Sequence, residues 1–131
     1  MQDQEYIDNV LRTESPVNPE MLARMANPET LRLLHAVIGM VTEAGELADA
    51  LKKHIFYGKP LDRINVLEEV GDSQWYAALA VDILKSTMAE VRQVNIAKLR
   101  ARFPDKFNAK DAQDRDLANE RAVLEQGHGQ G

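Results

Sequence analysis

The stretch that decides the fold is residues 28–55, PETLRLLHAVIGMVTEAGELADALKKHI. Pro28 suits the first position of a helix and Asn27 can cap it, so we predict one long helix that ends before Gly58 and Pro60. Its apolar residues recur at the spacing of a core face: Leu34, Val37, Ile38, Val41, Ala44, Ala48 and Ile55. We therefore expect this stripe to pack into the core.

A pair of carboxylates, Glu43 and Glu46, lies on nearly the opposite face of this helix. Residues three apart are neighbours on a helix surface, so both acids point the same way. Gly39 and Ala50 share this face, whereas a solvated face would more often carry long polar side chains. The small residues leave room for a ligand or for a closely packed helix.

A second acidic pair, Glu69 and Asp72, lies in the next predicted helix, residues 63–85, which Asp62 can cap. One acidic pair alone usually means solvated surface. Two pairs on adjacent helices repel each other unless a cation lies between them. Carboxylate oxygens are the ligands that Mg²⁺ and Mn²⁺ prefer. The two pairs together predict a site for a hard divalent metal, with Mg²⁺ as the first choice.

Helical patterns account for the rest of the chain as well. Asn18 can cap a short helix, and Thr87 with Glu90 fits a capping box. The further predicted helices are 3–12, 19–26, 88 to just before Pro104, and 109–125. No segment shows the alternation of a strand. We therefore expect an all-α fold, a helical bundle with a four-helix core.

Past Asp72 the helix over residues 63–85 is apolar nearly all round, which indicates burial in the protomer or in an oligomer. In a chain of this size we favour an oligomer interface, so the bundle is expected to be completed by oligomerisation. We assign residues 1–126 to a single domain and residues 127–131 to a flexible tail.

Composition excludes several classes of protein. The 131 residues contain no cysteine, so disulfides, thiolate zinc sites and cysteine nucleophiles are excluded. A net charge of −5 argues against binding nucleic acid through phosphate contacts. No apolar run is long enough for a membrane, and the first residues lack the pattern of a signal peptide. We expect a cytoplasmic protein with no membrane and no nucleic-acid partner.

The helix that ends before Pro104 carries Asn95, Lys98 and Arg102 on one face. Arg and Lys side chains suit phosphate groups, Arg as a fork and Lys as a point charge. The sequence has no glycine-rich phosphate loop, so a phosphate would have to be held by metal and side chains.

A resemblance to a known family rests on three segments of the chain: EAGELADALKK from residue 43, LEEVGDSQWY from residue 67 and NIAKLRARFP from residue 95. With 22 residues between Glu46 and Glu69, they resemble the signature of the all-α nucleoside triphosphate pyrophosphohydrolases, the MazG-like superfamily. The likeness covers roughly residues 30–120.

The resemblance implies a dimer-based helical bundle that hydrolyses a nucleoside triphosphate, NTP or dNTP, to the monophosphate and pyrophosphate. It implies Mg²⁺, with Mn²⁺ as a substitute, and attack of a metal-activated water on the α-phosphorus. The implied catalytic metal ligands are Glu43, Glu46, Glu69 and Asp72. The implied substrate contacts are Asn95 and Lys98, with Lys53 and Arg115 as further candidates.

Several alternatives stay open. Thr42 stands where many relatives have a glutamate, which leaves the general base and the number of metals undecided. Nucleotide-pool housecleaning, hydrolysis of phosphoribosyl-ATP, and a dUTPase-like or dCTPase-like specificity are all compatible with the resemblance. So are a homodimer and a homotetramer. A non-catalytic helical module that oligomerises or binds a nucleotide is the alternative of a different class.

Overall fold

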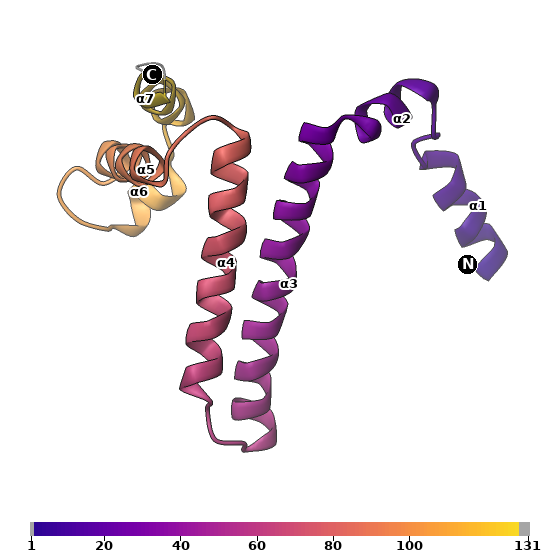
Figure 1. Ribbon diagram of the computed structural model, residues 1–131, viewed down its shortest axis with the longest axis horizontal. Helices are drawn as coiled ribbons and strands as arrows, with labels where there is room; N and C mark the ends of the chain where they lie inside the picture. Colours follow the sequence, from indigo (N-terminus) through magenta and orange to yellow (C-terminus); the bar gives the residue numbers. More distant parts are fainter. Residues whose placement is uncertain (1, 129–131) are drawn as a thin grey trace. The chain divides into compact units, whose positions relative to one another are not determined.

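The computed structural model describes residues 2–128, which form seven helices and no strand (Figure 1). The helices are α1 (Asp3–Thr13), α2 (Pro19–Ala26), α3 (Pro28–Tyr57), α4 (Arg63–Ile83), α5 (Met88–Arg102), α6 (Ala109–Gln113) and α7 (Leu117–His128). The predicted all-α class is confirmed. None of these helices combines the length and the apolar character needed to cross a bilayer. The chain divides into two compact units, Met1–Leu31 and Arg32–Gly131.

Side-chain caps fix where the helices begin. Backbone N–H groups of the first turn donate to each predicted cap at 2.8–3.1 Å: Asn18, Asn27, Asp62 and Thr87. Each cap satisfies donors that a helix start would otherwise leave unpaired. Only half of the predicted capping box forms, because the Glu90 carboxylate accepts a hydrogen bond from the Ser86 hydroxyl at 2.6 Å.

The predicted single helix over residues 109–125 is wrong, because the chain breaks between α6 and α7. Asp116 explains the break: its carboxylate accepts the backbone N–H of Asn119 at 3.0 Å and so starts a new helix. Short acidic side chains compete with helix hydrogen bonds in this way. α7 continues through Gly127 and His128, which the sequence had assigned to the tail. Residues 129–131 of that tail lie outside the described residues.

Helices α3 and α4 lie side by side as a hairpin (Figure 1). The residues of α3 that are buried are Ala36, Gly39 and Glu43, which share one face. Tyr76 of α4 lies directly on Gly39, where a Cβ atom would collide with its ring. The same ring meets His35 edge-on, with the ring centroids 5.7 Å apart. At Gly39, the room that we expected for a ligand or for a packed helix is taken by the Tyr76 side chain of α4.

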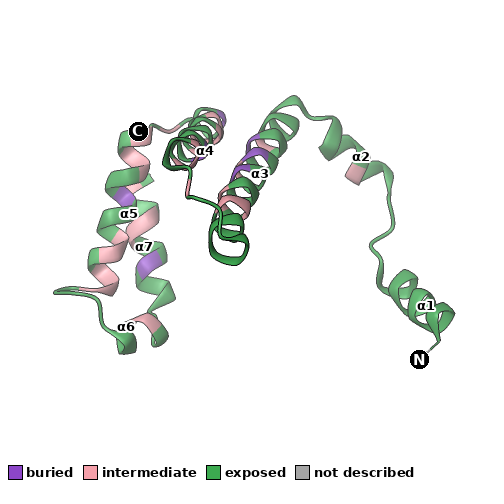
Figure 2. Cartoon of the chain, turned by 90° about the horizontal axis from the view of Figure 1, so that it is seen from below, coloured by how far each residue is buried: buried purple, intermediate pink, exposed green. Residues whose placement is uncertain are grey.

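The apolar stripe of α3 that was expected to form the core is instead exposed, so that prediction is wrong for the single chain. Val41 is 67% exposed and Ile55 is 66% exposed. On α4, Trp75 is 59% exposed. Figure 2 shows most of the surface of both helices as exposed. In the described part of the chain, most of the large apolar side chains of α3 and α4 are therefore exposed, whereas Ile83 of α4 is buried.

Helices α5 and α7 form a second packed pair (Figure 2). Val94 of α5 is buried and faces Gly127 of α7, where a Cβ atom would collide with the Val94 side chain. At the other end of the pair, both Nε and one terminal nitrogen of Arg102 donate to the carboxylate of Glu120, which is only 4% exposed. A bidentate ion pair and a glycine contact therefore join these helices.

We predict that Gly39→Ala destabilises the protein by about 1–3 kcal/mol, because the added methyl group overpacks the contact with Tyr76. Urea unfolding followed by circular dichroism measures the change. Gly45→Ala in the same helix is the matched control. Its Cβ would meet nothing within 4 Å, so the helix preference for alanine should stabilise it by about 0.5–1 kcal/mol. Equal stability changes in the two variants would contradict the packing account.

Candidate active site and metal centre

The hairpin brings together three of the four predicted acids. Ligand oxygens of Glu43 on α3 and of Glu69 and Asp72 on α4 all lie within 4.8 Å of one another. Two features of the sequence produce this cluster. The spacing of Glu69 and Asp72 puts both on one face of α4, and the close contact at Gly39 brings that face against α3.

The cluster is partly enclosed. Glu43 is 9% exposed and Glu69 is 5% exposed, whereas Asp72 opens to solvent. Burial raises the pKa of the Glu43 carboxyl, and a hydrogen bond with Glu69 and the charges of Glu46, Asp72 and Glu69 raise it further. Without a cation, the folded protein therefore resists full ionisation of this group.

Neighbouring polar groups hold the buried acids in place. The Nδ2 group of Asn65 donates to Oε1 of Glu69 at 2.7 Å. The Thr42 hydroxyl donates to the carbonyl of Gly39 at 2.8 Å and lies 3.4 Å from Oε1 of Glu43. Sequence reasoning did not assign Asn65 to the site, although its position four residues before Glu69 on the same helical face was a usable signal.

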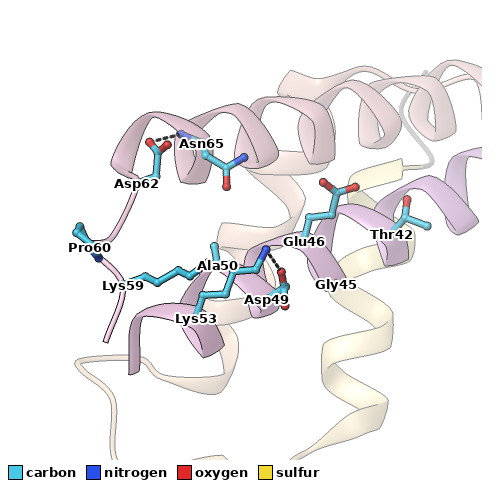
Figure 3. Close-up of a pocket in the computed structure, with 10 residues that line it drawn as sticks. All are labelled: Thr42, Gly45, Glu46, Asp49, Ala50, Lys53, Lys59, Pro60, Asp62 and Asn65. Carbon is cyan, nitrogen blue, oxygen red and sulfur yellow. Dashed lines mark hydrogen bonds and ion pairs between the residues drawn. The ribbon is translucent and has the colours of Figure 1, made fainter. Parts of the chain in front are cut away.

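The fourth acid, Glu46, lies outside the three-carboxylate cluster and lines a neighbouring cavity of about 610 Å³. The cavity runs between the second half of α3 and the start of α4. Figure 3 shows Glu46 and Thr42 at one end and Lys59 beside Pro60 at the other, with Lys53 between them. Nζ of Lys53 pairs with Asp49 at 2.5 Å. Two predicted site residues, Glu46 and Lys53, therefore share this cavity.

The donor set of the cluster fits a hard divalent cation. Three carboxylate groups converge on one point, two of them buried, and all offer oxygen atoms. Mg²⁺ is commonly bound by a few carboxylates and keeps further positions for water and substrate phosphates. The raised pKa of Glu43 indicates that this carboxyl is buried among other acids without a cation beside it in the described chain. Glu43, Glu69 and Asp72 are the residues that would hold the ion.

The structure does not join the predicted phosphate contacts of α5 to these acids. Asn95 is exposed and Lys98 is half-buried. Within residues 2–128, no hydrogen bond or ion pair connects either of them to the four carboxylates. Helix α5 packs mainly against α7, and it meets α4 only weakly.

Arg115 has a structural partner in this chain. Its Nε and a terminal nitrogen donate to the Glu120 carboxylate at 3.2 and 2.7 Å. Glu120 also binds Arg102, and the hydrogen bonds from Arg102 and Arg115 lower the pKa of Glu120 to about 2. A carboxylate shared by two guanidinium groups fixes the α5–α7 pair, which accounts for Arg115 without a substrate.

Comparison with known families identifies the domain that contains this cluster. The sequence model of the MazG nucleotide pyrophosphohydrolase domain matches residues 32–107, which is more than half of the chain. The chain belongs to this family, so nucleotide pyrophosphohydrolase activity is what its membership indicates. No curated protein and no solved structure matches the chain. The matched segment contains all four acids, Lys53, Asn95 and Lys98, but it ends before Arg115.

We predict that Glu43→Gln raises the melting temperature of the metal-free protein at about pH 7. The folded-state pKa of Glu43 is raised above its ordinary value of 4.5, so its ionisation costs stability as the pH rises above that value. The gain should vanish below about pH 4.5, where the carboxyl is protonated in both states. Thermal unfolding in EDTA measures the effect.

Adding Mg²⁺ should then stabilise the wild-type protein and not the Glu43→Gln variant, because ligand binding to the folded state raises its stability. Glu68→Gln is the control, since Glu68 is an exposed acid next to Glu69. This control should behave as the wild type does in EDTA and in Mg²⁺. Equal stabilisation of wild type and Glu43→Gln by Mg²⁺ would contradict the metal centre.

Proposed function

We propose that the protein is a Mg²⁺-dependent pyrophosphohydrolase that converts a nucleoside triphosphate, NTP or dNTP, to the monophosphate and pyrophosphate. The observation that carries this proposal is the cluster of Glu43, Glu69 and Asp72, which lies inside the segment matched by the family. Mn²⁺ has the same preference for oxygen ligands and can substitute.

The chemistry follows from the donor set. When bound, Mg²⁺ polarises phosphate oxygens and lowers the pKa of water. The water oxygen bonds to the α-phosphorus, and the α–β bridging oxygen leaves with the bonding electron pair as pyrophosphate. Glu46 lies outside the cluster and lines the cavity, so it can accept the proton that the water loses. Asn65 keeps Glu69 oriented through its hydrogen bond.

The role that fits this activity is removal of unwanted nucleotides from the cellular pool. A panel of NTPs, dNTPs, dUTP, dCTP and phosphoribosyl-ATP, with the products identified, finds the substrate and separates pyrophosphate release from stepwise loss of phosphate. A non-catalytic nucleotide-binding module would be stabilised by Mg²⁺ and nucleotide without forming any product.

We predict that Glu69→Gln lowers the rate of pyrophosphate release by at least about 100-fold, because it removes a buried metal ligand. Glu68→Gln changes the charge equally at the neighbouring exposed position and should keep nearly full activity. Steady-state assays at saturating Mg²⁺ measure both variants, and circular dichroism checks that both keep their helices. Full activity in Glu69→Gln would refute the assignment.

We also propose that the hairpin of α3 and α4 packs against a second copy of the chain. The large apolar residues exposed on these two helices include Ile38, Val41, Leu67 and Trp75. Exposed apolar patches of this kind mark interaction sites. Two such hairpins supply the four-helix core that a single chain lacks. In such an assembly, Asn95 and Lys98 of one copy could lie near the acids of the other copy. Within one chain they do not contact these acids.

We predict that Val41→Glu turns the assembly into monomers, because it places a charge in the apolar interface. Light scattering coupled to gel filtration measures the molar mass, which distinguishes dimer, tetramer and monomer. Val17→Glu is the matched control: Val17 is 69% exposed and Val41 is 67% exposed. A wild-type protein that is monomeric at all concentrations, or a Val41→Glu variant with unchanged mass, would contradict the proposal.

A further inference from the structure

The cavity beside the metal centre contains one positive charge that nothing in the described chain neutralises. Asp49 is already paired, with Lys52 at 2.9 Å and with Lys53 at 2.5 Å. Asp62 is also engaged, since its carboxylate caps α4. Lys59 lines the same cavity and forms no ion pair with any residue from 2 to 128.

The backbone of Lys59 is held in place by its surroundings. Gly58, with φ of 66°, turns the chain at the end of α3 in a conformation that favours glycine. The Lys59 N–H then donates to the carbonyl of Lys53 at 3.2 Å. Nδ1 of His54 lies 2.8 Å from the Lys59 carbonyl, to which its N–H can donate. These contacts hold the backbone of Lys59 at the rim of the cavity.

The lining of the cavity suits phosphates better than a nucleobase. None of the residues that line it within the described chain is aromatic, and Ala50 and Pro60 are the apolar residues among them. Base pockets normally supply aromatic or apolar faces for stacking. This cavity instead offers Lys59 at one end, Lys53 in the middle and an acid of the metal motif, Glu46, at the other end. Its volume of about 610 Å³ can hold a polyphosphate chain.

We propose that Lys59 binds the β- and γ-phosphates of the substrate, the part that leaves as pyrophosphate. This inference rests on the proposed function, in which the α-phosphorus lies at Glu43, Glu69 and Asp72. When the α–β bond breaks, negative charge collects on the departing pyrophosphate. The ammonium group of Lys59 stabilises that charge in a site where Lys53 is already paired with Asp49.

The test is binding of inorganic pyrophosphate in the presence of Mg²⁺, measured by isothermal titration calorimetry on the full chain. Lys59→Gln should weaken pyrophosphate binding by roughly tenfold or more, because it removes a charge-assisted contact. Lys59→Arg should retain most of the affinity. Lys106→Gln removes an exposed loop lysine outside the cavity and should bind pyrophosphate as the wild type does. Binding of a nucleoside monophosphate should be the same in all four proteins.

Kinetics provide a second readout. Lys59→Gln should raise the KM for the triphosphate and lower inhibition by added pyrophosphate. Wild-type affinity for pyrophosphate in Lys59→Gln would overturn the inference, even if the wild-type enzyme hydrolyses nucleotides as proposed. If no nucleotide is hydrolysed but pyrophosphate binding depends on Lys59, the pyrophosphate site at Lys59 is supported and the proposed function is refuted.

Discussion

The contact between Gly39 and Tyr76 determines the rest of the site. With no side chain at Gly39, the Tyr76 ring of α4 rests on the backbone of α3 and bridges the two long helices. The same two helices bring Glu43 within reach of Glu69 and Asp72. A larger residue at position 39 would collide with the Tyr76 ring and disturb this contact. The carboxylate cluster therefore depends on helix packing as well as on its acids.

Bringing these acids together costs folding free energy. Burial and the neighbouring acids raise the pKa of Glu43, so this carboxyl resists ionisation in the folded protein. A protein that needed only stability would place apolar residues on this face, so a cluster of this kind is typical of a functional site. Glu120 provides the contrast within the same chain. Glu120 is buried, as Glu43 is, but hydrogen bonds from two arginines lower its pKa to about 2. This is the pattern of a structural ion pair.

The sequence predicted most helix starts and the shared face of Glu69 and Asp72, because both follow from local rules. Caps such as Asn27 and Asp62 determine helix starts, and three-residue spacing determines a shared face. The buried face of α3 was predicted wrongly, because the stripe that includes Val41 is exposed in the described part of the chain. Lys59 was also missed, since its position depends on the loop at Gly58, which no helical periodicity describes.

The most direct test of the metal centre is a crystal structure of the protein grown with Mn²⁺, examined by anomalous scattering at the manganese edge. The account predicts an anomalous peak between the carboxylates of Glu43, Glu69 and Asp72, at the 2.0–2.2 Å or so that is usual for oxygen ligands of such ions. A manganese peak bound elsewhere in the chain, with these three carboxylates bare, would contradict it.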